Sequence, residues 1–214
     1  MDMPFLMPKN EEYQTWINRK DGVEEFFYPE YMKEIKWMND FLDACQVVFK
    51  SIYILGGNHD QARIDKFKSE TLPGYQHLFD WKRDLFLSTR NIDSCNYNDW
   101  LDLGDELTIT HGMAHGSTCL KKHYELSGGK SVIFGHVHTA DVKSFAARGK
   151  CKKVWSLPCM STLAPGYIKN AEVPWSNGFM IVNLRPNSMF NAHVMEVWDD
   201  KLVLPSGKVV DGSL

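Results

Sequence analysis

Three segments of the chain place histidine in a polar stretch directly after an apolar run. They are Asn58-His59-Asp60 after residues 51–55, His111-Gly112 after residues 106–110, and Gly135-His136-Val137-His138 after residues 131–134. The carboxyl end of a buried strand is a rigid place from which to aim a ligand, and open α/β sheets bind their ligands there. In an extended segment His136 and His138 would project to the same side, towards one centre.

These side chains suit a metal-assisted reaction. Imidazole nitrogen with amide or carboxylate oxygen, and without thiolate, favours first-row divalent ions in a catalytic site over structural zinc. Two such ions about 4 Å apart clamp a phosphoryl group and lower the pKa of a shared water, while a nearby imidazole protonates the leaving oxygen. A single histidine after a strand is more often an ordinary hydrogen-bonded turn residue, so the prediction depends on finding three such segments in one chain.

The order and spacing of these segments resemble the calcineurin-like metallophosphoesterase superfamily. The resemblance is carried by Gly57-Asn58-His59-Asp60, His111-Gly112 and Gly135-His136-Val137-His138. Residues 174–179 are also similar to the tail of small phage and bacterial members. The resemblance covers about residues 50–184 and implies an α/β fold, a layered β-sandwich flanked by helices, with metal ions at strand carboxyl ends. It implies a metal-dependent phosphatase or phosphodiesterase.

The resemblance assigns roles to six residues. Asn58, His111 and His136 would bind the second metal ion, and His138 would bind the first. His59 would be the general acid, and a hydrogen bond with Asp60 would hold its ring and tautomer. The implied cofactors are two divalent ions in a complete site, with Mn²⁺ first among the candidates and Fe, Zn or Ni as alternatives.

The pattern departs from the superfamily at its amino end. The Asp-x-His and Gly-Asp-x-x-Asp motifs, which supply first-metal ligands and the bridging carboxylate, are absent, and Asp2 matches only the last aspartate of the second motif. One expectation is therefore an N-terminally truncated copy of a working enzyme that lacks its first strands. The alternative is a non-catalytic remnant that binds one metal ion or a phosphorylated partner.

Hydrophobic periodicity predicts the elements that would position these segments. Helices are expected over residues 31–48, 61–69 and 117–126, and strands over residues 51–55, 106–110, 131–134, 142–146, 153–157, 178–184 and 190–198. This order favours an α/β layered fold that ends in an antiparallel sheet. No repeat or linker divides the chain, so a single calcineurin-like phosphoesterase domain over residues 1–214 is expected.

Composition limits the partners. A formal net charge of -3 does not indicate nucleic acid, although the run of residues 150–153 either contacts phosphate or forms a solvated turn before a strand. No apolar stretch is long enough for a membrane span and no secretory signal is present, so a cytoplasmic protein without a membrane partner is expected. The substrate is expected to be a phosphoester whose identity the sequence does not reveal.

The remaining aromatic and histidine residues fit packing better than chemistry. The aromatic residues between positions 75 and 100 are expected in the core, with base stacking as the alternative; they are Tyr75, Phe79, Trp81 and Trp100. His77, His123 and His193 are expected to be surface or packing residues, and His115 is a candidate for the rim of the site.

Overall fold

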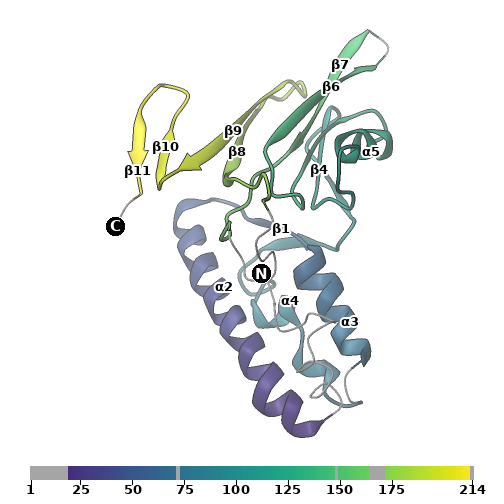
Figure 1. Ribbon diagram of the computed structural model, residues 1–214, viewed down its shortest axis with the longest axis vertical. Coiled ribbons are helices and arrows are strands. Elements are labelled where there is room, and N and C mark those ends of the chain that lie inside the picture. Colours follow the sequence, from purple (N-terminus) through teal and green to yellow (C-terminus); the bar gives the residue numbers. More distant parts are fainter. Residues whose placement is uncertain (1–18, 71–72, 148, 164–171, 213–214) are drawn as a thin grey trace. The chain divides into compact units, whose positions relative to one another are not determined.

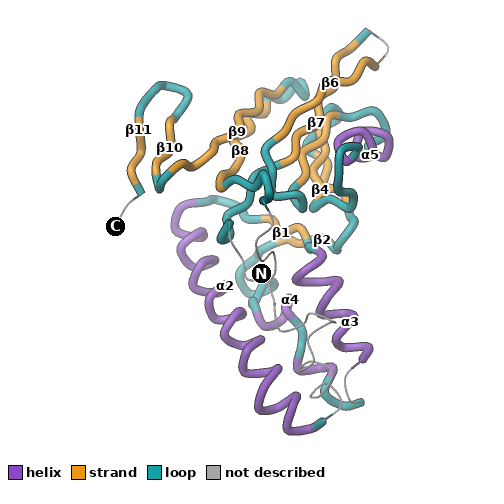
Figure 2. The backbone as a smooth tube through the Cα atoms, in the orientation of Figure 1, coloured by secondary structure: helices purple, strands orange, loops and turns teal. Residues whose placement is uncertain are grey.

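The computed structural model is a mixed α/β structure with several sheets and helices (Figures 1 and 2). It describes residues 19–70, 73–147, 149–163 and 172–212, so Asp2 lies outside the described residues. Contacts divide the chain into two compact units, residues 1–99 (unit 1) and residues 100–214 (unit 2), and each is described by itself. Compact units of this kind also occur within one domain, so the single-domain expectation stays a prediction.

Among the residues that the structure describes, most helices lie in unit 1. Its elements are the π-helices η2 (Gly22–Phe27) and η3 (Asn58–Ala62), the 3₁₀ turn η4 (Gln76–Leu78), the α-helices α2 (Tyr28–Val48), α3 (Arg63–Glu70) and α4 (Trp81–Asp84), and the strands β1 (Tyr53–Leu55) and β2 (Asp93–Cys95). The predicted helix over residues 31–48 is confirmed. Its α-helical part begins three residues earlier, at Tyr28, and continues directly from η2, since Phe27 already has helical backbone angles.

Aromatic rings fill the core of unit 1. Phe27, Tyr31, Phe67 and Phe79 are each at most 1% exposed. The Phe67 and Phe79 ring centroids are 4.7 Å apart, and those of Tyr31 and Phe79 are 5.2 Å apart, both edge-to-face. Edge-to-face pairs of this kind add to the free energy of apolar burial. Phe79 and Trp81 are therefore core residues, as the sequence predicts.

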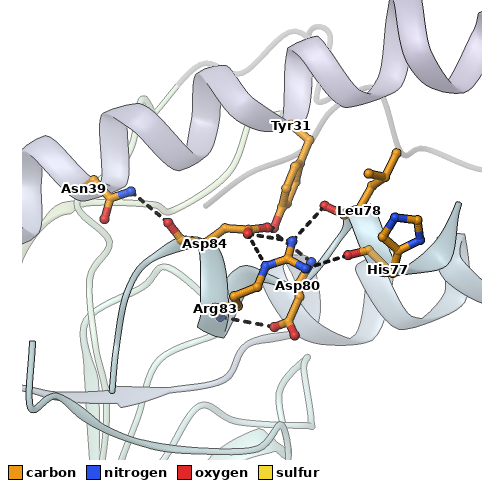
Figure 3. A network of polar contacts seen from close by, with 7 residues as sticks. All are labelled: Tyr31, Asn39, His77, Leu78, Asp80, Arg83 and Asp84. Carbon is orange, nitrogen blue, oxygen red and sulfur yellow. Dashed lines mark hydrogen bonds and ion pairs between the residues drawn. The ribbon is translucent and has the colours of Figure 1, made fainter. Parts of the chain in front are cut away.

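A part-buried polar network joins α4 to α2 (Figure 3). The Tyr31 hydroxyl and the Arg83 Nε–H each donate to the Asp84 carboxylate at 2.7 Å, and Asn39 donates to the Asp84 carbonyl at 3.0 Å. Burial, followed by the hydrogen bond to Asp84, raises the pKa of Tyr31. The phenol therefore stays protonated and keeps its role as donor.

The described residues of unit 2 form two sheets and one helix. The five-stranded sheet has the order β3 (Trp100–Asp102), β4 (Leu107–Thr110), β5 (Ser131–Phe134), β7 (Lys150–Ser156) and β6 (Asp141–Ala147), and β4, β5 and β7 are parallel neighbours. The antiparallel sheet has the order β11 (Val209–Asp211), β10 (Lys201–Val203), β9 (Phe190–Trp198) and β8 (Asn177–Leu184). The helix is α5 (Cys119–Leu126). All the strands and the helix predicted in this part of the chain are present.

Alternation along the strands gives unit 2 its layers. Val132 and Phe134 of β5 pack with Cys119 and Leu120 of α5, whereas Ile133 between them packs on the side of β8 and β9. Successive side chains on a strand point to opposite faces, so alternate residues of this buried strand belong to two different hydrophobic clusters. Helix, sheet and second sheet thus lie in three layers. No helix of the described ranges is both long and apolar enough to cross a membrane.

Candidate functional site

Two of the three histidine segments meet at one edge of the unit 2 sheet. The parallel register of β4 and β5 pairs Thr110 with Phe134, so His111 and Gly135 follow side by side. The Gly135 N–H donates to the His111 carbonyl at 2.9 Å, which extends the ladder by one step. The ring centroids of His111 and His136 lie 5.4 Å apart at an interplanar angle of 67°. The structure therefore places the predicted ligands His111 and His136 next to each other, whereas their role as metal ligands stays a prediction.

The segment after β5 is not extended, so the predicted geometry of His136 and His138 is wrong. Both residues have positive φ, 66° and 60°. The Val137 N–H donates to the Gly135 carbonyl at 2.7 Å, which closes a γ-turn at His136. Positive φ costs a residue other than glycine about 1–3 kcal/mol and is common at functional sites, where the surrounding structure imposes it.

Contacts with neighbouring segments of unit 2 hold this turn in its strained conformation. The Ser176 N–H donates to the His138 carbonyl at 3.1 Å, and the Ser156 hydroxyl donates to the Thr139 carbonyl at 2.7 Å. The Trp175 ring lies edge-on against the His138 ring, with centroids 4.6 Å apart. The stretch of residues 174–179 that carries part of the sequence resemblance therefore contacts a predicted ligand directly.

Gly112 lies in tight contact with this turn. It has a φ of +108°, and a Cβ atom added there would lie 2.9 Å from the His136 Cβ and 3.0 Å from the Phe134 Cδ2. Real Cβ atoms essentially never show the first distance, and the second is tighter than most, so glycine lets the two loops approach this closely.

His123 is a structural part of the site that sequence reasoning did not assign to it. Its side chain is fully buried on α5, its Nε2 accepts from the Met113 N–H at 3.1 Å, and its Nδ1 bonds the Cys119 carbonyl at 2.8 Å. Burial lowers the pKa of His123. The expectation of a packing role for it is confirmed. Its position four residues after Cys119 and three after Leu120, on the apolar face of α5, was the available signal.

Asn58, His59 and Asp60 belong to unit 1. This polar stretch after β1 is not a loop, because these residues form the first turn of η3, which leads directly into α3. The Asp60 carboxylate accepts from the N–H of Gly57 at 2.7 Å and of Gln61 at 3.2 Å, which stabilises this helix start. The predicted hydrogen bond between Asp60 and His59 stays a prediction.

The ring separation of the histidine pair can be compared with that of two imidazoles on one divalent ion. An ion about 2.1 Å from the nearest nitrogen of each ring would place the ring centroids about 5 Å apart. The observed 5.4 Å agrees with this, although an ordinary edge-to-face contact has a similar separation. Within the described ranges, no group of three or more His, Cys, Asp and Glu side chains is arranged to hold a metal ion.

The lysine run lies at the opposite, amino end of the parallel strands. Residues 150–153 are the start of β7 and not a turn, because they pair with β6. Lys150 and Lys152 both bind the Glu106 carboxylate, which precedes β4, and the side chain of Lys152 is only 9% exposed. These residues line an open cavity of about 660 Å³ together with Asn187 and Phe190. Neither sequence interpretation of this run described an internal ion pair.

The ion pairs of Glu106 with the two lysines predict that the free energy of unfolding falls at acid pH. Its hydrogen bonds with Lys152 and Lys150 lower the pKa of Glu106 from 4.5 to about 2. Because the folded pKa lies below the unfolded one, its stabilisation is present above pH 4.5 and is lost as the pH falls towards about 2. Urea unfolding across this pH range should show that the free energy of unfolding depends less steeply on pH in Glu106→Gln than in the parent chain. The variant should also be less stable than the parent at pH 7. Glu125 forms an exposed ion pair with Lys121 on α5, and Glu125→Gln should keep the pH dependence of the parent chain.

Comparisons with known proteins assign no family. No protein-family model and no curated protein matches the chain. Among solved structures, a double mutant of Vps29 from Entamoeba histolytica is similar over 80% of this chain and 87% of its own, with 16% identity and a TM-score of 0.39. A likeness at this TM-score carries no argument about the function of this chain.

Proposed function

We propose that the chain is a metal-dependent phosphoester hydrolase of the calcineurin-like metallophosphoesterase type, with a dinuclear divalent-metal site. The observation that carries the proposal is the pair of parallel strand ends in unit 2. There, His111 and His136 lie with ring centroids 5.4 Å apart and the following turn has strained backbone angles. Neutral imidazoles at a rigid sheet edge are suitable ligands for first-row divalent ions.

The protein groups have separate tasks in this proposal. His111, His136 and His138 would hold divalent ions, of which Mn²⁺ is the first candidate and Fe, Zn or Ni are alternatives. The ions would supply Lewis-acid polarisation of the phosphoryl group and a water of lowered pKa. The backbone holds the ligands, because the Gly135 N–H and the Ser176 N–H fix the carbonyls of His111 and His138.

The roles in unit 1 are predictions from the sequence resemblance. Asn58 would be a further metal ligand, and His59 would protonate the leaving oxygen. Asp60 would orient the His59 ring, and its carboxylate is itself held by the backbone N–H groups of Gly57 and Gln61. A carboxylate fixed in this way is suited to setting an imidazole tautomer.

The proposal predicts metal-stimulated cleavage of an aryl phosphate ester. Mn²⁺ titration by calorimetry should show binding that weakens more than tenfold in His111→Ala and in His136→Ala. Hydrolysis of bis(4-nitrophenyl) phosphate should depend on Mn²⁺ and should fall about 10²–10⁴-fold in His59→Ala. His77→Ala, at an exposed position in unit 1, serves as the control and should change neither result.

A second candidate function is the binding of one metal ion without turnover. It is favoured by the presence of a two-imidazole arrangement within unit 2 alone. One ion per chain and no hydrolysis would support this candidate over the hydrolase. Two ions per chain with turnover would exclude it, and no binding of Mn²⁺, Zn²⁺, Fe²⁺ or Ni²⁺ would contradict both.

A further inference from the structure

We propose that His123 is the positioning residue of the candidate metal centre: its imidazole ties the backbone after Gly112 to α5 and so sets His111 against His136. This inference rests on the proposed function, because a positioning role requires a metal centre, but the contacts that support it are those of His123 itself. His123 itself would touch neither metal nor substrate.

Both ring nitrogens of His123 form hydrogen bonds within the protein. A neutral imidazole carries one N–H donor and one acceptor nitrogen. The Met113 N–H is a donor, so Nε2 is the acceptor, 3.1 Å away. The proton therefore sits on Nδ1, which donates to the Cys119 carbonyl at 2.8 Å. With both nitrogens engaged and the side chain fully buried, this ring serves as a bridge between the loop and the helix.

The bridge reaches the histidine pair through packing contacts. The His123 ring stacks on Phe134, with centroids 3.7 Å apart and an interplanar angle of 17°. Phe134 and the His136 Cβ both lie against Gly112, since a Cβ there would be 3.0 and 2.9 Å from them. Met113 directly follows Gly112, so the hydrogen bond to Met113 fixes the loop at the place where it meets His136.

The chemistry of the bridge explains why histidine occupies this position. A phenyl ring would keep the stacking on Phe134 but would leave the Met113 N–H and the Cys119 carbonyl without these partners. An aliphatic residue would lose the stacking on Phe134 as well as the two hydrogen bonds. Removal of a group that orients metal ligands through hydrogen bonds typically weakens metal affinity 10- to 100-fold.

Two variants separate positioning from simple packing. In His123→Gln the amide oxygen can replace Nε2 and accept from the Met113 N–H, whereas in His123→Asn the amide nitrogen can replace Nδ1 and donate to the Cys119 carbonyl. Both lose the stacked ring, so both should lower the thermal midpoint by a similar amount. Mn²⁺ affinity should differ, staying within threefold of the parent in His123→Gln and falling 10- to 100-fold in His123→Asn.

The measurements are calorimetric Mn²⁺ titration and thermal unfolding, with imidazole NMR signals as the second readout. Equal affinities in the two variants, or parent affinity in His123→Asn, would overturn the positioning role. If the parent chain binds no metal, the proposed function fails but the inference is still tested. The ring signals of His111 and His136 should then shift further from their parent positions in His123→Asn than in His123→Gln, and equal shifts in the two variants would refute it.

Discussion

Gly112→Ala is expected to lose both stability and metal affinity. Its new Cβ would meet the His136 Cβ at 2.9 Å and the Phe134 Cδ2 at 3.0 Å, on a backbone held at a φ of +108°. Overpacking and left-handed strain together should cost roughly 2–4 kcal/mol of the free energy of unfolding. Because relief requires His136 to move away, Mn²⁺ affinity should fall at least tenfold even at temperatures where the variant is folded.

Gly116→Ala is the matched control for this change. Gly116 lies in the same loop with a φ of +77°, but an added Cβ would meet nothing within 4 Å. The variant should lose only about 1 kcal/mol, from the unfavourable φ, and should bind Mn²⁺ like the parent. Urea unfolding and calorimetry check both variants. Parent affinity in Gly112→Ala would show that the loop contact does not set the ligand geometry.

The strands that end at the histidine pair could be predicted from the sequence. Apolar runs over residues 106–110 and 131–134 predicted β4 and β5, and parallel neighbours end at the same edge of a sheet. The resemblance assigned His111 and His136 to one metal ion, but the parallel pairing of the two strands and the ring separation come from the structure alone. The same local signals predicted α2 and β9, whose apolar periodicities extend over many residues.

The geometry beyond the strand ends was not predictable, because tertiary contacts decide it. The extended interpretation of His136 and His138 relied on intrinsic strand behaviour, whereas the γ-turn is held by partners distant in sequence, such as Ser176. Short strands such as β10 carry too few residues for a period to be read. His123 was overlooked as part of the site because a histidine on the apolar face of a helix is usually a packing residue, and here packing and positioning coincide.

Gly178→Ala is expected to have the largest effect on stability. Gly178 lies opposite Glu196 in the β8–β9 pair, and its N–H donates to the Cys159 carbonyl at 2.9 Å. A Cβ there would lie 2.2 Å from the Met195 carbonyl oxygen and 2.9 Å from the Pro158 Cγ. Backbone on one side and a ring on the other leave no soft neighbour to yield, so the strands must separate. The expected loss is roughly 3 kcal/mol or more.

The consequence extends from β8 to the core of unit 2. Met180 and Val182 of β8 pack against the Ile133 and Trp155 layer, so separation of β8 from β9 exposes that layer. Urea unfolding followed by tryptophan fluorescence and circular dichroism should show a large fall in the midpoint, or no folded baseline. Gly207→Ala, in the β10–β11 turn with a φ of +82° and open space around it, should lose only about 1 kcal/mol. Similar midpoints for the two variants would mean that β8 and β9 accommodate an extra methyl group at Gly178 without separating, which would contradict this prediction.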